Sequence, residues 1–316
     1  MFNVRINSVG HYAPSNIVSN SDLEKIVDTD DNWIYTRTGI KNRRISLGEN
    51  TTDLAYNAAK ELDLEGVDLV IFASFTPDKL APHSAAILKK KLGIDAGTCF
   101  DLNAGCSGFI YGLKVAISML QTGLHKKALV VGSEVISKVL DWNDRGTCVL
   151  FGDGAGAMVL ESSAKPSFYS IYTNSIDDTD NSLHVGGVEN SNFIVKGDES
   201  NQVVKMDGTK VFKFATGAVA DGIEKALEQS GLTLDDISYI VPHQANERII
   251  KNVSKGKNIP LNKFYLNIDS YGNTSSASIP IAFSEAVEKG VIKRGDKVLF
   301  VGFGAGLTWG STIFEF

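Results

Sequence analysis

Short apolar runs alternate with longer amphipathic stretches along most of the chain. The runs over residues 67–71, 128–132, 237–241 and 298–302 have the length and the β-branched content of buried strands. Helix-like stretches separate them, and this alternation is typical of α/β proteins. The pattern therefore predicts strands and helices that alternate along the chain around buried sheets.

The apolar runs recur at a constant distance along the sequence. Residues 67–71 resemble residues 237–241, and residues 128–132 resemble residues 298–302. The offset is the same for both pairs, because 237 − 67 equals 298 − 128. An offset shared by two separate pairs of runs indicates an internal duplication.

The duplication divides the chain and places two unusual segments at equivalent positions. The same offset lays Asn103–Ser107 over Asn273–Ala277, and a helix-like stretch follows each segment. We therefore predict two rigidly packed halves, residues 1–165 and 166–316, with a pocket where the equivalent turns meet. The polar stretch over residues 173–199 is interpreted as a long surface loop.

Composition narrows the functional classes. The 316 residues are 43% hydrophobic and 22% charged, which is ordinary for a globular protein. A formal net charge of −6 argues against nucleic acid as a partner. The apolar runs are much shorter than the roughly 20 residues that span a bilayer, and the N-terminus lacks a signal-peptide pattern. We expect a cytoplasmic protein without a membrane partner.

Cys99, Cys106 and Cys148 form neither a disulfide framework nor a metal-binding motif. Cys106 differs from the other two because it lies among small residues, in NAGCSG, just before a predicted helix over residues 109–121. A helix N-terminus lowers the pKa of a thiol, and the thiolate is the nucleophilic form. We interpret Cys106 as a nucleophile and the other two cysteines as buried structural residues.

His243 and Asn273 are polar residues at the ends of apolar segments in the second half. His243 follows an apolar run that ends at Pro242, where α/β folds place ligand-facing groups. Asn273 stands in GNTS, which on its own is ordinary turn chemistry. A cysteine, a histidine and an amide at strand ends of a duplicated fold together predict one shared site.

The motifs around these three residues resemble those of the β-ketoacyl-acyl-carrier-protein synthase III family, part of the thiolase-like superfamily of condensing enzymes. NAGCSG around Cys106, PHQAN around His243 and GNTS around Asn273 are similar to the family's cysteine, histidine and asparagine boxes. The resemblance spans nearly the whole chain. Further matching segments lie at residues 33–40, 144–147, 151–156 and 307–311.

The resemblance implies an α/β/α/β/α fold of five layers, with a mixed five-stranded sheet in each half, that works as a homodimer. It also implies an acyltransferase that starts fatty acid synthesis. Cys106 would take an acyl group, normally acetyl, from CoA, and malonyl-acyl carrier protein would lose CO₂ and condense with it. His243 and Asn273 would donate hydrogen bonds to the malonyl thioester oxygen. The backbone N–H groups of Cys106 and Ala305 would form the oxyanion hole.

The same resemblance implies separate contacts for the two substrates. CoA would lie against Trp33, Arg37 and Arg145, and the acidic acyl carrier protein would bind a local basic patch. CoA thioesters are substrates, so we expect neither a cofactor nor a metal. The residues assigned to the carrier-protein surface are Lys213, Gln244, Ala245, Asn246, Glu247, Arg248 and Lys255.

Two segments depart from the family pattern and leave the preferred acyl chain open. The C-terminal turn reads Gly304–Ala305–Gly306 where the family usually has three glycines. The added methyl group would tighten the acyl pocket or shift the oxyanion N–H group. Residues 79–83 lack the aromatic side chain that some members use to close the pocket across the dimer.

Residues in the matched motifs distinguish this chain from related enzymes of the same superfamily. A degradative thiolase would need a second cysteine within residues 302–306, which contain none. An elongating synthase has a second histidine where this chain has Asn273, and a hydroxymethylglutaryl-CoA synthase needs an acidic base that the matched boxes lack. Specialised acyltransferases and polyketide or quinolone starter synthases share the cysteine, histidine and asparagine, and they stay open.

Two hypotheses come from other classes of protein. Residues 152–156 resemble the glycine-rich loop of a dinucleotide-binding protein, but the run that follows is strand-like rather than helical. A homologue that binds carrier protein without catalysis is the other alternative. The intact set of Cys106, His243 and Asn273 argues against it.

Overall fold

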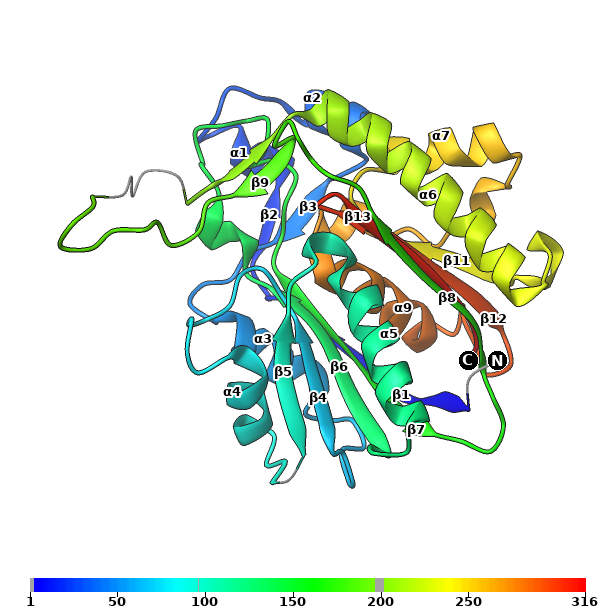
Figure 1. The fold of residues 1–316 in the computed structure, drawn as a ribbon. Coiled ribbons are helices and arrows are strands. Elements are labelled where there is room, and N and C mark those ends of the chain that lie inside the picture. The colour runs from blue at the N-terminus through cyan, green and yellow to red at the C-terminus, as the bar shows by residue number, and fades with distance from the viewer. Residues whose placement is uncertain (1–2, 96, 197–201) are drawn as a thin grey trace.

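Two β-sheets, with a pair of helices between them, form the centre of the molecule (Figure 1). The computed structural model describes residues 3–95, 97–196 and 202–316. Within these residues, one large sheet has five strands in the order β1-β7-β6-β4-β5, and the other has four in the order β11-β12-β13-β8. Their bounds are β1 Val4–Tyr12, β4 Leu69–Ala73, β5 Thr98–Leu102, β6 Lys127–Glu134, β7 Gly154–Ser162, β8 Phe168–Ser175, β11 Tyr239–Pro242, β12 Lys297–Gly304 and β13 Thr308–Glu315.

Helices fill the three remaining layers. Helices α5 and α9 lie between the sheets, α3 and α4 cover the outer face of the five-stranded sheet, and α6 covers the outer face of the other sheet with α7 packed on it (Figure 1). This arrangement confirms the predicted α/β/α/β/α layers. The bounds are α3 Thr51–Ala59, α4 Ser84–Lys91, α5 Gly108–Gln121, α6 Gly208–Ser230, α7 Glu247–Lys257 and α9 Ser278–Glu288.

Most of the smaller elements lie beside the strand ends near the top of the view in Figure 1. The short helices over residues 234–236 and 261–263 lie instead beside the start of β11, where Lys263 donates to the carbonyls of Leu234 and Ile237. Together the smaller elements form two two-stranded sheets, β2 with β3 and β9 with β10, and several short helices. Their bounds are β2 Ile17–Ser19, β3 Asn42–Arg44, β9 Leu183–Val185, β10 Val204–Met206, α1 Asn20–Leu23, α2 Asp31–Thr38, α8 Ile268–Tyr271, η1 Gly105–Ser107, η2 Ile136–Val139, η3 Leu234–Asp236, η4 Leu261–Lys263 and η5 Ser275–Ala277.

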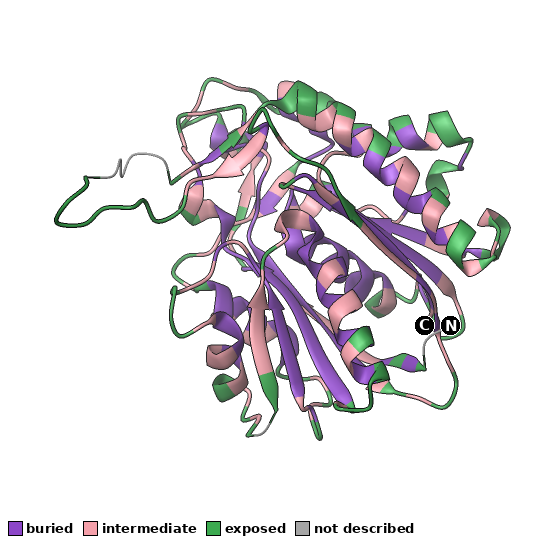
Figure 2. Ribbon diagram, viewed as in Figure 1, coloured by how far each residue is buried: buried purple, intermediate pink, exposed green. Residues whose placement is uncertain are grey.

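The central strands are buried along their whole length, whereas the outer faces of α6 and α7 are exposed (Figure 2). Helices cover both faces of the sheet, which explains why β4 and β6 are continuous apolar runs rather than alternating ones. Among the described residues, no helix combines the length and the apolar character needed to cross a membrane.

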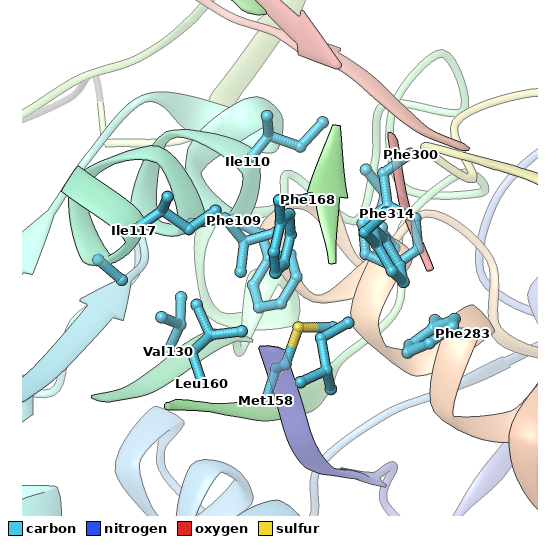
Figure 3. Close-up of a cluster of buried hydrophobic side chains, with 14 of the residues drawn as sticks. Phe109, Ile110, Ile117, Val130, Met158, Leu160, Phe168, Phe283, Phe300 and Phe314 are labelled. Carbon is cyan, nitrogen blue, oxygen red and sulfur yellow. The ribbon is translucent and has the colours of Figure 1, made fainter. Parts of the chain in front are cut away.

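One apolar cluster joins the two sheets through α5 and α9 (Figure 3). The ring of Phe283 in α9 meets Phe300 and Phe314 of the four-stranded sheet edge-on, with centroids 5.1 and 5.5 Å apart. Phe109 of α5 and Met158 of the five-stranded sheet belong to the same cluster. Close packing of this kind holds the strand ends of both sheets at fixed relative positions.

Strand pairing confirms the internal duplication. Leu69 pairs with Ala128 in the first sheet, and Tyr239 pairs with Val298 in the second, so both partners are displaced by the predicted offset (239 − 69 equals 298 − 128). The short turns η1 and η5 begin at Gly105 and Ser275, which differ by the same offset, and these two residues have φ of 53° and 51°. The division into residues 1–165 and 166–316 stays a prediction.

The predicted fifth strand of the second sheet is wrong. The segment at the place equivalent to β5 makes only an isolated bridge between Phe264 and Ile240. Tyr265 donates its N–H to the carbonyl of Ile240, but its own carbonyl accepts the side-chain amide of Gln244 at 3.2 Å. A side chain therefore takes the place of a ladder hydrogen bond, and pairing stops after one residue.

The predicted long loop over residues 173–199 is also shorter than expected. Strand β8 continues to Ser175, and Leu183–Val185 forms β9, which pairs antiparallel with β10. The alternation in Leu183–His184–Val185 is too short to stand out among polar neighbours. Residues 197–199 of the predicted loop lie outside the described residues.

Candidate active site

The large cavity of the molecule, about 1140 Å³, is lined by residues from both sheets and from the small elements beside them. Cys106, His243 and Asn273 all line it, although they are distant in the sequence. The prediction that these three residues share one site is confirmed in its geometry. Their catalytic roles stay a prediction.

Cys106 lies in a tight turn between β5 and α5. Gly105 adopts φ = 53°, a left-handed conformation that favours glycine. The side-chain oxygen of Asn103 accepts the N–H of Gly105 at 3.1 Å, so the chain turns away from the sheet directly after β5. The turn η1 then places Cys106 two residues before the first residue of α5.

A second turn, from the C-terminal strands, packs on the Cys106 turn. A Cβ atom on Gly304 would lie 2.5 Å from the backbone nitrogen of Cys106, so only glycine fits there. The hydroxyl groups of Ser107 and Thr308 lie 2.8 Å apart and join the two turns. Ala305 also lines the cavity, and its backbone nitrogen would lie 3.1 Å from a Cβ atom on Gly105. Its part in an oxyanion hole stays a prediction.

The pKa of Cys106 differs from the sequence-based prediction of a lowered value. Burial of the thiol raises its pKa to about 12, because the thiolate loses solvation. A hydrogen bond with the Ser275 hydroxyl lowers the pKa, and the nearby negative charge of Glu134 raises it further. The position of Cys106 before a helix therefore does not decide its pKa, and the resting thiol keeps its proton at neutral pH.

His243 follows β11, and the surrounding protein buries its ring almost completely. Burial lowers the pKa of His243 to about 3, so the imidazole is neutral at neutral pH. Its Nδ1 lies 2.6 Å from the Ser278 hydroxyl, and the ring meets Phe303 edge-on at 5.0 Å. The N–H of Gln244 donates to the oxygen of Ser278 at 3.4 Å, which leaves the serine proton for Nδ1. We infer that Nε2 carries the imidazole proton and is a donor.

Asn273 is fixed by hydrogen bonds that leave its amide donor available. Its side-chain oxygen accepts the N–H of Ser275 at 2.8 Å, as Asn103 does for Gly105 in the equivalent turn of the duplication. The backbone of Asn273 bonds to Leu150 and Gly152 on both sides, at 2.9 and 3.0 Å. With its oxygen occupied, the side chain offers Nδ2 as a hydrogen-bond donor at the cavity wall.

Comparison with known proteins decides the family. The family models described as 3-oxoacyl-[acyl-carrier-protein] synthase III and its C-terminal part match residues 100–178 and 227–316. β-Ketoacyl-[acyl-carrier-protein] synthase III of Clostridium novyi is 47% identical, and the match covers 100% of this chain and 99% of the relative. The chain belongs to the β-ketoacyl-[acyl-carrier-protein] synthase III family. It is thus an acyltransferase.

Solved structures agree with this family. The 3-oxoacyl-[acyl-carrier-protein] synthase III of Aquifex aeolicus superposes with a TM-score of 0.92 at 41% identity, covering 99% of this chain and 100% of that chain. A priming β-ketosynthase from a polyketide biosynthetic pathway superposes with a TM-score of 0.91 at 33% identity, covering 99% and 96%. The thiolase-like fold that the sequence predicted is therefore confirmed.

The residues predicted to bind CoA lie together in this synthase III chain. Both guanidinium groups lie near the Trp33 ring, with the central carbons of Arg37 and Arg145 at 4.7 and 5.1 Å from its centroid. All three line the large cavity. Arg145 also donates to the backbone carbonyl of Asp28 at 2.8 Å, which holds it beside the indole.

The predicted carrier-protein residues divide into three groups. Ala245, Asn246 and Arg248 line the cavity, and Lys213 and Lys255 are exposed. Gln244 was wrongly assigned to a surface. It is 3% exposed, and its amide bonds to the backbone of Pro242, Tyr265 and Asn267.

Glu247 does not fit a surface for an acidic partner either. Its carboxylate pairs with Lys251 at 2.8 Å, and a Cβ atom on Gly39 would lie 2.7 Å from the Glu247 Cβ. The residue packs α7 against the end of α2 and neutralises a lysine. We expect it to position α7 rather than to contact a carrier protein.

Three polar residues near the site were missed at the sequence level. Ser278 bonds to His243, Ser275 bonds to Glu134, and both Ser275 and Glu134 influence the pKa of Cys106. Serines in a GNTSSAS segment carry no distinguishing pattern. Glu134 gave the one available signal, a charged residue at the end of the apolar run over residues 128–132.

Gly304 provides a test of the packing between the two turns. A Cβ atom there would lie 2.5 and 3.0 Å from the backbone nitrogens of Cys106 and Ser107, so Gly304→Ala forces the backbone apart. We expect a loss of about 1–3 kcal/mol in the free energy of unfolding, typical of overpacking, and slower acylation of Cys106. Chemical denaturation and acylation kinetics measure both effects.

Gly217 supplies the matched control for this substitution. It lies within α6, and a Cβ atom on it would meet nothing within 4 Å. Gly217→Ala should leave acylation unchanged and stabilise the helix by about 0.5–1 kcal/mol. Wild-type stability and acylation in Gly304→Ala would show that the turns are not packed as described.

Proposed function

We propose that this synthase III chain starts fatty acid synthesis by joining the acetyl group of acetyl-CoA, or another short acyl group, to malonyl-acyl carrier protein. The observation that supports this reaction best is the meeting of a cysteine and two neutral hydrogen-bond donors in one cavity. A nucleophile is needed to hold the acyl group, and donors are needed to stabilise an enolate.

In the first half-reaction Cys106 attacks the carbonyl carbon of the acyl-CoA. A C–S bond to Cys106 forms, the C–S bond to CoA breaks, and CoA leaves with the thiol proton. The backbone N–H groups of Cys106 and Ala305 stabilise the oxyanion that develops on the carbonyl oxygen. Gly304 supports this role, because its close contact with Cys106 brings the two backbone segments together.

In the second half-reaction malonyl-acyl carrier protein loses CO₂ next to His243 and Asn273. Negative charge then gathers on the thioester oxygen, and Nε2–H of His243 and Nδ2–H of Asn273 donate to it. The resulting enolate attacks the acyl group on Cys106, and the released thiolate takes up a proton. Burial suits these donors, because the low pKa of His243 keeps it neutral, and donors in a dry site stabilise charge more strongly.

The two substrates would approach the cavity past different residues. Trp33 offers a face on which an adenine ring stacks, and Arg37 and Arg145 offer charge to the CoA phosphates. Arg248, Lys213 and Lys255 make no ion pair among the described residues, so their charge is available to an acidic carrier protein. We propose these three, with Ala245 and Asn246, as the carrier-protein surface.

We propose further that the chain works as a homodimer in the cytoplasm. Strand β5 lies at the edge of the five-stranded sheet, with no strand paired to its outer side among the described residues. An edge of this kind is a template for pairing with another chain. The three unpaired cysteines fit a reducing compartment.

Release of CO₂ from malonyl-acyl carrier protein tests the proposed reaction. The chain is incubated with labelled malonyl-acyl carrier protein and a panel of acyl-CoA thioesters from acetyl to octanoyl. We expect CO₂ and a β-ketoacyl product with acetyl-CoA. Activity with longer or branched thioesters alone would indicate a specialised or starter synthase, to which the similar polyketide priming β-ketosynthase points. No turnover with any thioester would support a non-catalytic homologue.

A further inference from the structure

Ser278 is the first residue of α9, and its hydroxyl meets the ring of His243 inside the protein. Its Oγ lies 2.6 Å from Nδ1 of the imidazole, and the exposed fractions of Ser278 and His243 are 2% and 1%. The contact is therefore a buried hydrogen bond between the start of a helix and the residue that follows β11. The proposed reaction uses His243 and assigns no part to Ser278.

The internal duplication shows that packing alone does not need this pair of side chains. The residues at the equivalent places of the first half are Ala73 and Gly108, because 243 − 73 equals 278 − 108. A Cβ atom on Gly108 would lie 3.3 Å from the Cβ atom of Ala73, so a helix start meets a strand end there in the same way. Two small residues fill that place, and the hydroxyl and imidazole are a specific feature of the second half.

Other groups already hold the backbone around His243. The N–H of His243 donates to the carbonyl of Val301 at 2.8 Å. The side-chain amide of Gln244 donates to the carbonyl of Tyr265 at 3.2 Å and fixes the next residue. These bonds determine where the histidine lies, but they do not select which ring nitrogen carries the proton or which way the ring faces. Ser278 can select both, because it contacts a ring nitrogen directly.

The hydrogen bonds at Ser278 Oγ select the tautomer of the imidazole. The N–H of Gln244 donates to this oxygen at 3.4 Å, and among the described residues only Nδ1 of His243 lies where it can accept the hydroxyl proton. A proton on Nδ1 would leave the serine proton buried without an acceptor, which is costly. Nε2 therefore carries the imidazole proton. It has no hydrogen-bond partner among the described residues and is not fully buried, so it opens on the cavity.

We propose that Ser278 is a positioning residue for His243, which keeps the proton on Nε2 and the ring turned toward the malonyl thioester oxygen. The proposal rests on the second half-reaction of the proposed function, in which Nε2–H donates to that oxygen. The imidazole stays neutral, and the Ser278 proton stays on its own oxygen, so no bond to hydrogen breaks. Because Ser278 acts only through His243, its loss should not slow the acylation of Cys106.

The variant Ser278→Ala, alone and combined with His243→Ala, tests this role kinetically. Alone it should slow the release of CO₂ from malonyl-acyl carrier protein by about 10–100-fold, the usual effect of losing a group that orients an imidazole. Acylation by acetyl-CoA should stay near the wild-type rate. Added to His243→Ala, it should slow CO₂ release no further, because the imidazole through which it acts is already absent. A purely structural defect would slow both half-reactions and add to the loss in the double variant.

Ser284→Ala is the matched control. Ser284 also lies on α9, and its hydroxyl lies 3.0 Å from Nδ1 of His11. Neither of these two residues lines the cavity. The control therefore removes a hydroxyl–imidazole hydrogen bond from the same helix, away from the site. We expect Ser284→Ala to take up acetyl and to release CO₂ at the wild-type rates.

The ¹⁵N spectrum of protein labelled at its histidines reports the tautomer of His243 without any substrate. The signals of His243 are those that His243→Ala removes. In the wild-type protein we expect a protonated Nε2 and an unprotonated, hydrogen-bonded Nδ1. The Nδ1 signal should move in Ser278→Ala, because the nitrogen loses its donor, and it should stay in place in Ser284→Ala. If Ser278→Ala does not fold, the wild-type spectrum still decides the tautomer.

A protonated Nδ1 in the wild-type protein would overturn the proposal. An unchanged Nδ1 signal in Ser278→Ala, or a double variant slower than His243→Ala, would overturn it as well. Failure of the proposed function looks different. A wild-type chain with the expected spectrum that releases no CO₂ would keep the pairing of Ser278 with His243 and contradict the reaction. Wild-type CO₂ release that Ser278→Ala leaves unchanged would keep the reaction and contradict the positioning role.

Discussion

Replacing Cys106 with alanine should abolish transfer of the acetyl group from acetyl-CoA to the protein. Cys106 is the cysteine that lines the cavity, and its turn is closed on one side by Gly304 and on the other by α5. Loss of a covalent nucleophile removes the acyl-enzyme route entirely, and the overall rate should fall by roughly 10⁴–10⁶-fold. Intact-protein mass spectrometry after incubation with acetyl-CoA measures the labelling.

Cys99→Ala is the matched control for this experiment. Cys99 lies on β5, its sulfur is 3.6 Å from Nε2 of His83, and it does not line the cavity. We expect its label to equal that of the wild-type chain. An acetyl label retained by Cys106→Ala would contradict the mechanism, and a label lost by Cys99→Ala would move the nucleophile to the edge strand.

The continuous apolar runs predicted the buried strands and the duplication, whereas the layers of the fold came from the resemblance to the synthase III family. The constant offset read from four apolar runs returns unchanged in the pairing of Leu69 with Ala128 and Tyr239 with Val298. The prediction of a fifth strand in the second sheet was wrong. There the side chain of Gln244 replaces a ladder bond, and a contact between residues so far apart has no local pattern.

For the site, the motifs identified which residues meet but not their electrostatic state. Cys106, His243 and Asn273 line one cavity, as their boxes predicted. The thiol pKa was wrong in direction, because the sequence shows the helix that follows Cys106 and does not show the burial that dominates it. Glu134 was missed for the same reason, since the hydroxyl groups that donate to it come from segments that meet only in the folded chain.

Removing either donor should separate the two half-reactions. We expect His243→Ala and Asn273→Ala to be acylated by acetyl-CoA at nearly the wild-type rate, because neither side chain is needed to attack the thioester. Each should release CO₂ from malonyl-acyl carrier protein about 10²–10³-fold more slowly, the usual cost of losing one donor to a developing oxyanion. Mass spectrometry follows the acylation, and release of labelled CO₂ follows the decarboxylation.

The pH dependence of the decarboxylation rate distinguishes a lost hydrogen-bond donor from a purely structural defect. Burial lowers the pKa of His243 to about 3, so its neutral form is present at all pH values above that range. Wild-type decarboxylation should therefore show no inflection from His243 between pH 5 and 8, and the ratio of the His243→Ala rate to the wild-type rate should stay constant there. Slow acylation with normal decarboxylation in these variants would contradict the assigned roles. It would show that His243 and Asn273 act in the acylation of Cys106 rather than in decarboxylation. A ratio that changes near pH 6 would instead mean that His243 titrates as an exposed imidazole and acts by transferring a proton.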